Sequence, residues 1–189
     1  MTEFVELRQD GLILNAVRAS DAPRVTAACQ RPVAEQFLTT PWPYTSEDSK
    51  YFLETWVPEG WADVHEETVW AIRETEDGDL LGVIGLRNHT HELGYWLTED
   101  AEGRGVMTRA VEAVVDHAFR VRGMPLVYWE AHVGNWASLG VARRTGFSYH
   151  GTRQGKVTER APNPVSWFAS RSNGAPFAHP VLEWPTPER

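Results

Sequence analysis

Between residues 103 and 122, apolar side chains recur at every third or fourth position, which predicts a long amphipathic helix. The buried stripe of this helix would consist of Met107, Ala110, Val111, Val114, Val115, Ala118 and Phe119. Charged residues such as Arg109 and Glu112 occupy the opposite face. At 1.5 Å per residue the helix would be about 30 Å long.

Runs of alternating or continuous apolar residues predict strands on both sides of this helix. The runs before the helix lie at residues 12–17, 67–74, 80–88 and 91–97. The runs after it lie at residues 125–133, 147–154 and 165–171. An acidic turn at residues 76–79 would join two of the strands as a hairpin. This order of elements indicates an α/β protein.

Shorter helices are predicted at residues 21–30, 47–57 and 135–146. Ser20 or Asp21 would cap the first of them, and Ser46 would cap the second. Prolines break the segment 31–45, so we expect a loop or short helical turns there.

The length and composition fit one folded domain with a sizeable core: the chain has 189 residues, of which 42% are hydrophobic and 23% charged. No internal repeat and no linker divides the sequence. We therefore predict a single domain over residues 1–172, followed by a proline-rich, irregular tail over residues 173–189.

The net charge of −8 argues against binding to nucleic acid or to an anionic membrane surface. No apolar run approaches the roughly 20 residues that span a bilayer, and the acidic start of the chain is unlike a secretory signal. The single cysteine, Cys29, allows no internal disulfide bond and is expected to be a small buried thiol. Because the histidines are scattered, no metal site is expected. We therefore expect a cytoplasmic protein.

Two glycines, Gly103 and Gly105, stand at the start of the long helix, where serine or aspartate would be a better cap. Taken alone, this spacing is explained by a strand-to-helix turn. The other explanation is a phosphate, most simply a diphosphate, held by the unpaired N–H groups of the first helical turn. Arg104 and Arg109 would add positive charge there. Neither the Walker loop nor the dinucleotide-binding fingerprint is matched.

Three motifs, in order and correctly spaced, resemble the GNAT superfamily of acyl-coenzyme A-dependent N-acyltransferases, most of all its branch of ribosomal-protein N-terminal acetyltransferases. The first two are Glu92-Leu93-Gly94-Tyr95-Trp96-Leu97 and Gly103–Ala110. The third consists of Asn135, Ser138, Val141, Arg144, Gly146 and Phe147. The resemblance covers about residues 10 to 172. Glu102 departs from the family pattern, which usually has arginine there, and puts an acid beside the expected diphosphate.

The resemblance implies a twisted mixed sheet of six or seven strands with helices on both faces, and acetyl-CoA or another acyl-CoA as co-substrate. The main chain that would bind the pantetheine arm belongs to Trp96, Leu97 and Thr98. The diphosphate would lie against Gly103, Arg104, Gly105, Val106, Met107 and Thr108. Arg144, together with Arg143, would reach the phosphates of the adenosine end. Asn135 would bond to the pantetheine, cap the following helix, or do both.

The same resemblance implies direct transfer of the acyl group from the thioester to an amine. Ser138 would donate a hydrogen bond or a proton to the leaving thiol, unless it is an exposed helix residue. Glu92 would take the amine proton directly or through a water, with His89 and His91 as alternates. The plain alternative for Glu92 is a strand-edge carboxylate in water. A backbone N–H near Leu97 would meet the oxyanion.

Aromatic side chains gather in the segment that would cover the acceptor. We predict that Trp42, Tyr44 and Trp56 contact the acceptor, while Phe37 and Trp61 either join them or fill the core. Acidic residues of this region would steer a cationic amine, although an ordinary acidic surface explains most of them. These acids are Glu47, Asp48, Glu59, Asp63, Glu66 and Glu67.

The sequence thus predicts an N-acyltransferase that moves an acetyl group, or a larger group such as succinyl, from acyl-CoA to a primary amine. The acceptor would be a protein N-terminus or a small molecule, and the enzyme a monomer or a homodimer. A non-catalytic acyl-CoA-binding or regulatory module of the same fold is the alternative, and another kind of nucleotide-binding domain is the weaker one. Glu92, Asn135 and Ser138 favour the enzyme.

Overall fold

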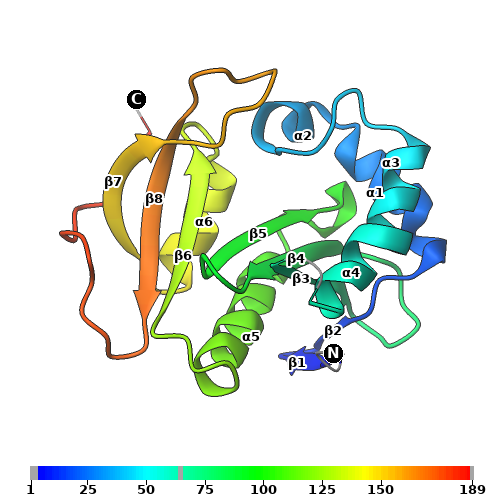
Figure 1. The fold of residues 1–189 in the computed structure, drawn as a ribbon, viewed down its shortest axis with the longest axis horizontal. Helices are drawn as coiled ribbons and strands as arrows, with labels where there is room; N and C mark the ends of the chain where they lie inside the picture. The colour runs from blue at the N-terminus through cyan, green and yellow to red at the C-terminus, as the bar shows by residue number, and fades with distance from the viewer. Residues whose placement is uncertain (1–3, 64–65, 188–189) are drawn as a thin grey trace.

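The structure is a computed structural model that describes residues 4–63 and 66–187. Its strands form one eight-stranded sheet in the order β1-β2-β3-β4-β5-β6-β8-β7 (Figure 1). The strands are β1 (Leu7–Gln9), β2 (Leu12–Asn15), β3 (Glu67–Arg73), β4 (Gly82–Arg87), β5 (Glu92–Leu97), β6 (Leu126–His132), β7 (Ser148–Gln154) and β8 (Val165–Ser172). The β5–β6 pair is parallel, and the other neighbouring pairs run antiparallel. The expected mixed sheet is confirmed.

The sheet has eight strands and not the six or seven expected, because the hydrophobic pattern does not reveal β1. This strand has three residues, which are too few to show an alternation. Asp10 and Gly11 form the turn into β2 with left-handed φ values of 43° and 78°, and the turn pairs Leu7 with Leu14.

The helices are α1 (Ala22–Cys29), α2 (Pro32–Phe37), α3 (Ser46–Tyr51), α4 (Val57–Trp61), α5 (Val106–Arg120) and α6 (Trp136–Arg144). A π-helical turn, Phe52–Trp56, joins α3 to α4. The cap of α3 is Thr45: its hydroxyl accepts a hydrogen bond from the N–H of Asp48, whose carboxylate accepts one from the N–H of Thr45. The prediction that Ser46 is the cap was therefore wrong by one position.

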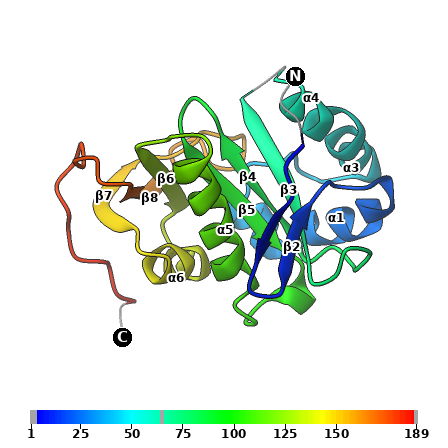
Figure 2. The same ribbon diagram turned by 90° about the horizontal axis from the view of Figure 1, so that it is seen from below.

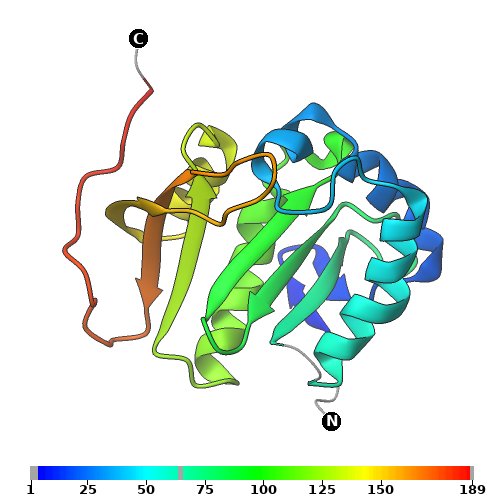
Figure 3. The same cartoon turned by 45° about the horizontal axis from the view of Figure 1, so that its top comes forward.

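Helices cover both faces of the sheet, as expected. Figure 3 shows α5 and α6 behind the strands and α3 with α4 in front of them. In Figure 2, α1, α3 and α4 gather at the β2–β3 end of the molecule, far from α6. The stripe predicted for α5 is its buried side, since Met107, Val111 and Val115 are among its buried residues. The helix begins at Val106, because the two glycines before it form the connecting loop.

The sheet opens between β5 and β6. These strands pair only at Glu92 with Tyr128 and at Leu93 with Trp129, although β6 continues to His132. Beyond that point they diverge, as Figure 1 shows. An edge of main chain therefore faces a gap in the middle of the sheet.

The tail beyond β8 lies against the sheet. The Leu182 N–H donates to the carbonyl of Tyr149 at 2.8 Å. The Trp184 ring stacks on Tyr149, with centroids 5.2 Å apart, and meets Trp129 edge-on at 6.0 Å. Apart from the isolated bridge at Leu182, its described residues have irregular structure. The tail thus packs on a strand that borders the gap.

Within the described ranges, no helix combines the length and the apolar character that crossing a membrane requires. The described residues also contain no cluster of three or more histidine, cysteine or acidic side chains arranged to hold a metal ion.

Candidate functional site

Two cavities meet at the gap between β5 and β6. The first, the loop cavity, has a volume of about 650 Å³ and lies among the start of α5, α6 and the α1–α2 corner. The second, the aromatic cavity, has a volume of about 510 Å³ and lies among the α2–α3 segment and β3 to β6. The residues that line both are Leu38, Tyr95, Trp96, Asn135 and Ser138. The two cavities therefore adjoin one another at the gap.

Hydrogen bonds at the two ends of β5 determine which main-chain groups face the gap, because these groups point alternately to the two neighbouring strands. The Thr98 N–H donates at 2.9 Å to the carbonyl just before β4. The His91 carbonyl accepts at 2.8 Å from β6. Counting from His91 in steps of two residues, the main-chain N–H and C=O groups of Tyr95 and Leu97 point to the gap.

The structure separates the three residues whose main chain was expected to bind the pantetheine arm. Leu97 faces the gap and lines the loop cavity. Trp96 turns its main chain to β4 and lines both cavities. The N–H and the hydroxyl of Thr98 both donate to the Leu81 carbonyl, and Thr98 lines neither cavity. Tyr95, which the first motif also contains, turns its main chain to the gap and lines both cavities.

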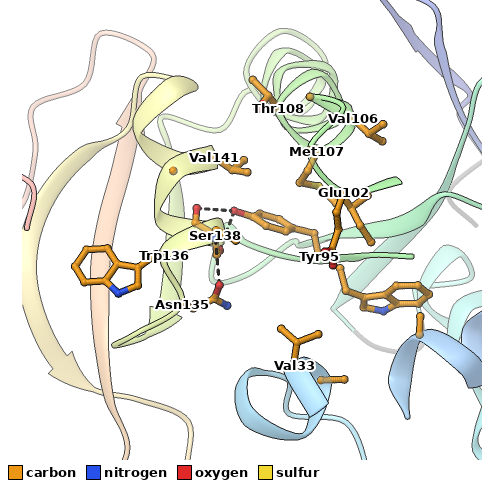
Figure 4. Close-up of a pocket in the computed structure, with 18 of the residues that line it drawn as sticks. Val33, Tyr95, Glu102, Val106, Met107, Thr108, Asn135, Trp136, Ser138 and Val141 are labelled. Atoms are coloured by element: carbon orange, nitrogen blue, oxygen red, sulfur yellow. Dashed lines mark hydrogen bonds between the residues drawn. The ribbon is translucent and has the colours of Figure 1, made fainter. Parts of the chain in front are cut away.

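The glycine loop faces open space. Gly103 and Gly105 have left-handed φ values of 70° and 69°, and no atom would lie within 4 Å of a Cβ added to either. Crowding inside the protein therefore does not explain the glycines, although the turn does favour them. Gly105 precedes α5 and supplies no side-chain cap for the N–H groups of the first turn. Val106, Met107 and Thr108 of that turn line the loop cavity (Figure 4), which makes the loop a suitable place for an anion.

The two arginines expected to add charge at the loop are bonded to protein groups, and Arg109 donates at 3.4 Å to the carbonyls of Gly105 and Arg104 in the loop itself. Arg104 forms an ion pair with Glu74, and Arg109 donates at 2.8 Å to the main chain of the β1–β2 turn. Neither lines the loop cavity. Arg144 does line it, as does Arg31, which the sequence gave no reason to single out because its segment lies outside the motifs.

Ser138, Tyr95 and Trp129 form a hydrogen-bonded triangle where the cavities meet. Trp129 Nε1 lies 3.0 Å from both the Tyr95 hydroxyl and Ser138 Oγ, and these two oxygens are 3.1 Å apart (Figure 4). Burial raises the pKa of Tyr95 to about 12, so its hydroxyl keeps its proton at neutral pH. Ser138 is half-buried, and its hydrogen bonds to Trp129 and Tyr95 hold its side chain in place.

Asn135 caps α6, since its Oδ1 accepts a hydrogen bond of 3.1 Å from the Ser138 N–H. It also lines both cavities. The cap and a contact with a bound molecule are therefore compatible roles for this residue.

Three basic side chains surround the carboxylate of Glu92, which lines the aromatic cavity. Its Oε1 accepts from Arg87 at 2.5 Å and from Lys156 at 2.8 Å, and its Oε2 lies 3.8 Å from Arg153. The side chain is only 12% exposed. Glu92 is therefore part of an ion-pair network and not a strand-edge carboxylate in open water.

The histidines named as alternates for the base, His89 and His91, line neither cavity. His132 lines the aromatic cavity. It lies on β6, four residues beyond Tyr128, which is the register partner of Glu92. Its position emerges only when the strands are paired, so no signal in the sequence could have found it.

Tyr44 and Trp56, two of the three aromatic residues predicted to contact the acceptor, line the aromatic cavity together with Phe37. Trp42 lies outside the lining, and Trp61 is buried in the core. The acidic lining residues are Asp48, Glu67, Glu92 and Glu130, and the basic ones are Arg87 and Lys156. The acidic excess favours a cationic molecule.

Cys29 is buried, as expected, and lines neither cavity. Burial raises the pKa of its thiol to about 12. Because a thiol is nucleophilic only as the thiolate, Cys29 is unsuited to carry an acyl group.

Comparisons with known proteins agree with the three motifs. A protein-family profile described as an acetyltransferase (GNAT) domain matches residues 11–148. A Bacillus subtilis (strain 168) protein, YdaF, whose name describes a ribosomal N-acetyltransferase, is 36% identical over 80 residues, 40% of this chain and 44% of that protein. The ribosomal-protein-serine acetyltransferase of Escherichia coli (strain K12) is 30% identical over 100 residues, 50% of this chain and 56% of that protein. The chain thus matches about half the length of these curated relatives.

The solved structure of the microcin C7 self-immunity acetyltransferase MccE, in complex with acetyl-CoA and AMP, has the same fold. It superposes with a TM-score of 0.71 at 18% identity, covering 86% of this chain and 93% of that chain. At this identity the likeness shows the fold alone.

Proposed function

The chain belongs to the GNAT family of acetyltransferases, and we propose that it transfers an acetyl group from acetyl-coenzyme A to a protein N-terminus by direct attack of the amine. The observation that carries this proposal is that two cavities of different character meet at Ser138 and Tyr95. One has an open glycine loop that suits phosphates, and the other has acidic and aromatic walls that suit an amine.

The loop cavity supports the donor side of the proposal. The glycine loop and the first turn of α5 would hold the diphosphate, with Arg144 nearby. The main-chain groups of Tyr95 and Leu97 at the gap would pair with the amides of the pantetheine arm, which resolves the cost of an unpaired strand edge. In this arrangement the thioester lies where the two cavities meet.

A count of donors and acceptors supports a role for Ser138 at the leaving thiol. Trp129 Nε1–H can only donate, so Ser138 Oγ accepts from it at 3.0 Å, and the Ser138 hydroxyl in turn donates to the Tyr95 hydroxyl at 3.1 Å. When negative charge develops on the sulfur, the Ser138 hydroxyl would rotate its proton from the Tyr95 oxygen to the sulfur, while Trp129 continues to donate to Ser138 Oγ. A hydrogen bond to the departing sulfur strengthens as negative charge develops there, so it lowers the barrier to transfer.

An amine must lose its proton before it can attack the thioester, so the pKa of the amine determines which acceptors are suitable. With a pKa of about 7.7–8.0, roughly a tenth of an α-amine is neutral at pH 7, whereas only about one lysine amine in 2,500 is. We propose that Glu92 takes the remaining proton through a water, while Arg87 and Lys156 share its negative charge. A carboxylate held by two cations suits a weakly basic α-amine better than a lysine.

The names of the curated relatives also favour a protein acceptor, since both refer to ribosomal acetyltransferases. The test is a panel of acceptors incubated with acetyl-CoA or succinyl-CoA and followed by mass spectrometry. The panel contains peptides with an open N-terminus, the same peptides blocked at the N-terminus but carrying one lysine, and small amines. Acetylation of the open N-termini is expected. Transfer to no amine, with coenzyme A binding intact, would instead support a non-catalytic module.

A further inference from the structure

An ion pair joins the α1–α2 corner to the glycine loop. Arg31, the residue before α2, donates from Nη1 to Glu102 Oε1 at 2.8 Å. Both side chains line the loop cavity, and Glu102 directly precedes Gly103. Figure 4 shows Glu102 close to Met107, with α2 on the facing side of the cavity. The pair therefore lies beside the proposed diphosphate site.

The loop cavity has two arginines in its described lining, Arg31 and Arg144. They come from different parts of the fold, the α1–α2 corner and α6. Arg144 is within 3.4 Å of the Thr108 hydroxyl, so it lies near the first turn of α5. Arg104 and Arg109 do not line this cavity, and Arg31 is the cation that pairs with Glu102, the residue before the glycines.

A phosphate group could replace the Glu102 carboxylate as the partner of Arg31. The Arg31 side chain is 21% exposed and that of Glu102 is 49% exposed, and ion pairs near water contribute little net free energy. Arginine binds phosphate through two parallel hydrogen bonds, and its planar group suits this geometry better than lysine does. A diphosphate at the loop would bring more negative charge to Arg31 than the single carboxylate of Glu102.

We propose that Arg31 is a ligand of the coenzyme A diphosphate, and that Glu102 holds it beside the loop before binding and competes with the phosphates for it. This inference rests on the proposed function, since it assumes that coenzyme A occupies the loop cavity. The family pattern usually has arginine where this chain has Glu102. In this chain Arg31, which comes from another element, supplies the positive charge at that position.

Binding affinities for three related ligands test the proposal. Coenzyme A and dephospho-coenzyme A both carry the diphosphate, and pantetheine carries no phosphate. By calorimetry, Arg31→Gln should weaken binding of the first two by about tenfold, the weight of one charge-assisted hydrogen bond, and leave pantetheine unchanged. Arg31→Lys should retain part of the affinity. Glu102→Gln should strengthen coenzyme A binding severalfold, and by less in the Arg31→Gln background.

Arg24→Gln is the matched control. Arg24 also reaches from α1 to the segment before the glycines, where it pairs with Asp100 at 2.7 Å, but it does not line the loop cavity. Its substitution should leave all three affinities unchanged. Thermal unfolding of each variant verifies folding, and Arg31→Lys replaces Arg31→Gln if the latter does not fold.

Two outcomes would overturn the inference alone. One is an unchanged affinity of Arg31→Gln for coenzyme A, and the other is an equal loss for pantetheine, which would mean that Arg31 shapes the cavity and does not bind phosphate. If the wild-type protein binds neither coenzyme A nor dephospho-coenzyme A, the proposed function fails as well.

Discussion

Ser138 lines both cavities and is hydrogen-bonded to Tyr95 and Trp129 where the cavities meet. Ser138→Ala should lower kcat about 10²-fold and leave the KM for acetyl-CoA nearly unchanged, because the hydrogen bond to sulfur strengthens only as the thiolate forms. Steady-state kinetics test this, with Ser148→Ala on β7 as the control, since Ser148 lines neither cavity. A loss confined to KM would make Ser138 a binding residue.

Glu92 is the proposed base, and it is held by Arg87 and Lys156. If it takes the amine proton, Glu92→Gln should reduce the rate near pH 7 by roughly 10²–10⁴-fold, and for an α-amine the loss should shrink by about pH 8 as more amine becomes neutral. The pH–rate profile measures both. His89→Asn, at an exposed position outside the cavities, should keep the wild-type profile.

A loss in Glu92→Gln that does not shrink with pH would instead assign Glu92 to holding Arg87 and Lys156 in place. The pH–rate profile of His132→Asn should then be measured, because His132 lines the same cavity. A loss in this variant that shrinks as the pH rises would identify His132 as the base.

Tyr95 makes stability depend on pH in the alkaline range. The folded protein keeps the Tyr95 proton up to about pH 12, whereas an unfolded tyrosine loses it near pH 10. The folded state therefore binds more protons in between, so this contribution to stability is complete below about pH 10 and is lost as the pH rises toward 12. In urea unfolding at increasing pH, Tyr95→Phe should lose less stability than the wild type over this window. Tyr51→Phe, at a tyrosine that is 56% exposed, is the control.

The motifs indicated the elements that border the two cavities, but side-chain directions required the structure. Main-chain alternation puts Tyr95 at the gap and turns Thr98 away. Arg104 stands between two loop glycines, yet Glu74 draws its side chain outward. Trp129 reaches the site from a strand that the apolar pattern predicts, and Arg31 from a proline-broken segment, but tertiary packing alone brings their side chains there.

The connection between β5 and α5 is the element that carries the proposed diphosphate site. Gly105→Glu should abolish coenzyme A binding while the protein stays folded, since the side chain would enter the open space before the loop and carry a negative charge. Calorimetry and thermal unfolding measure the two effects. Gly123→Glu is matched to it: Gly123 has a φ of 63°, also has open space, and lies beyond the other end of α5.

Both substitutions should lower the free energy of unfolding by about 1–2 kcal/mol, because a residue with a side chain is strained in the left-handed conformation. The Gly123 variant should nevertheless bind coenzyme A normally. Unchanged affinity in Gly105→Glu would remove the glycine loop from the donor site.

Periodicity predicted long elements well and short ones poorly. The stripe of α5 spans four turns, so its repeat is unmistakable in the sequence. β1 has three residues and depends on pairing with β2. The cap of α3 was misplaced because Thr45 and Ser46 are adjacent residues of similar capping tendency, and the reciprocal bonds with Asp48 decide between them.

At the scale of the whole molecule, the loop cavity and the aromatic cavity, which are the proposed donor and acceptor sites, meet where β5 and β6 diverge. The composition and periodicity of the chain did not reveal this divergence. The walls of both cavities come from segments far apart in sequence, such as α2 and α6, so their volumes and charges follow only from the packed fold.

The central claim is that donor and acceptor bind together and react at the gap. The most direct test is the initial rate of acetyl transfer to a peptide with an open N-terminus, measured while both substrates are varied. Direct transfer in one ternary complex predicts intersecting double-reciprocal lines, unchanged in Cys29→Ala. Parallel lines would indicate a covalent acyl-enzyme that forms before the acceptor binds, and would contradict the account.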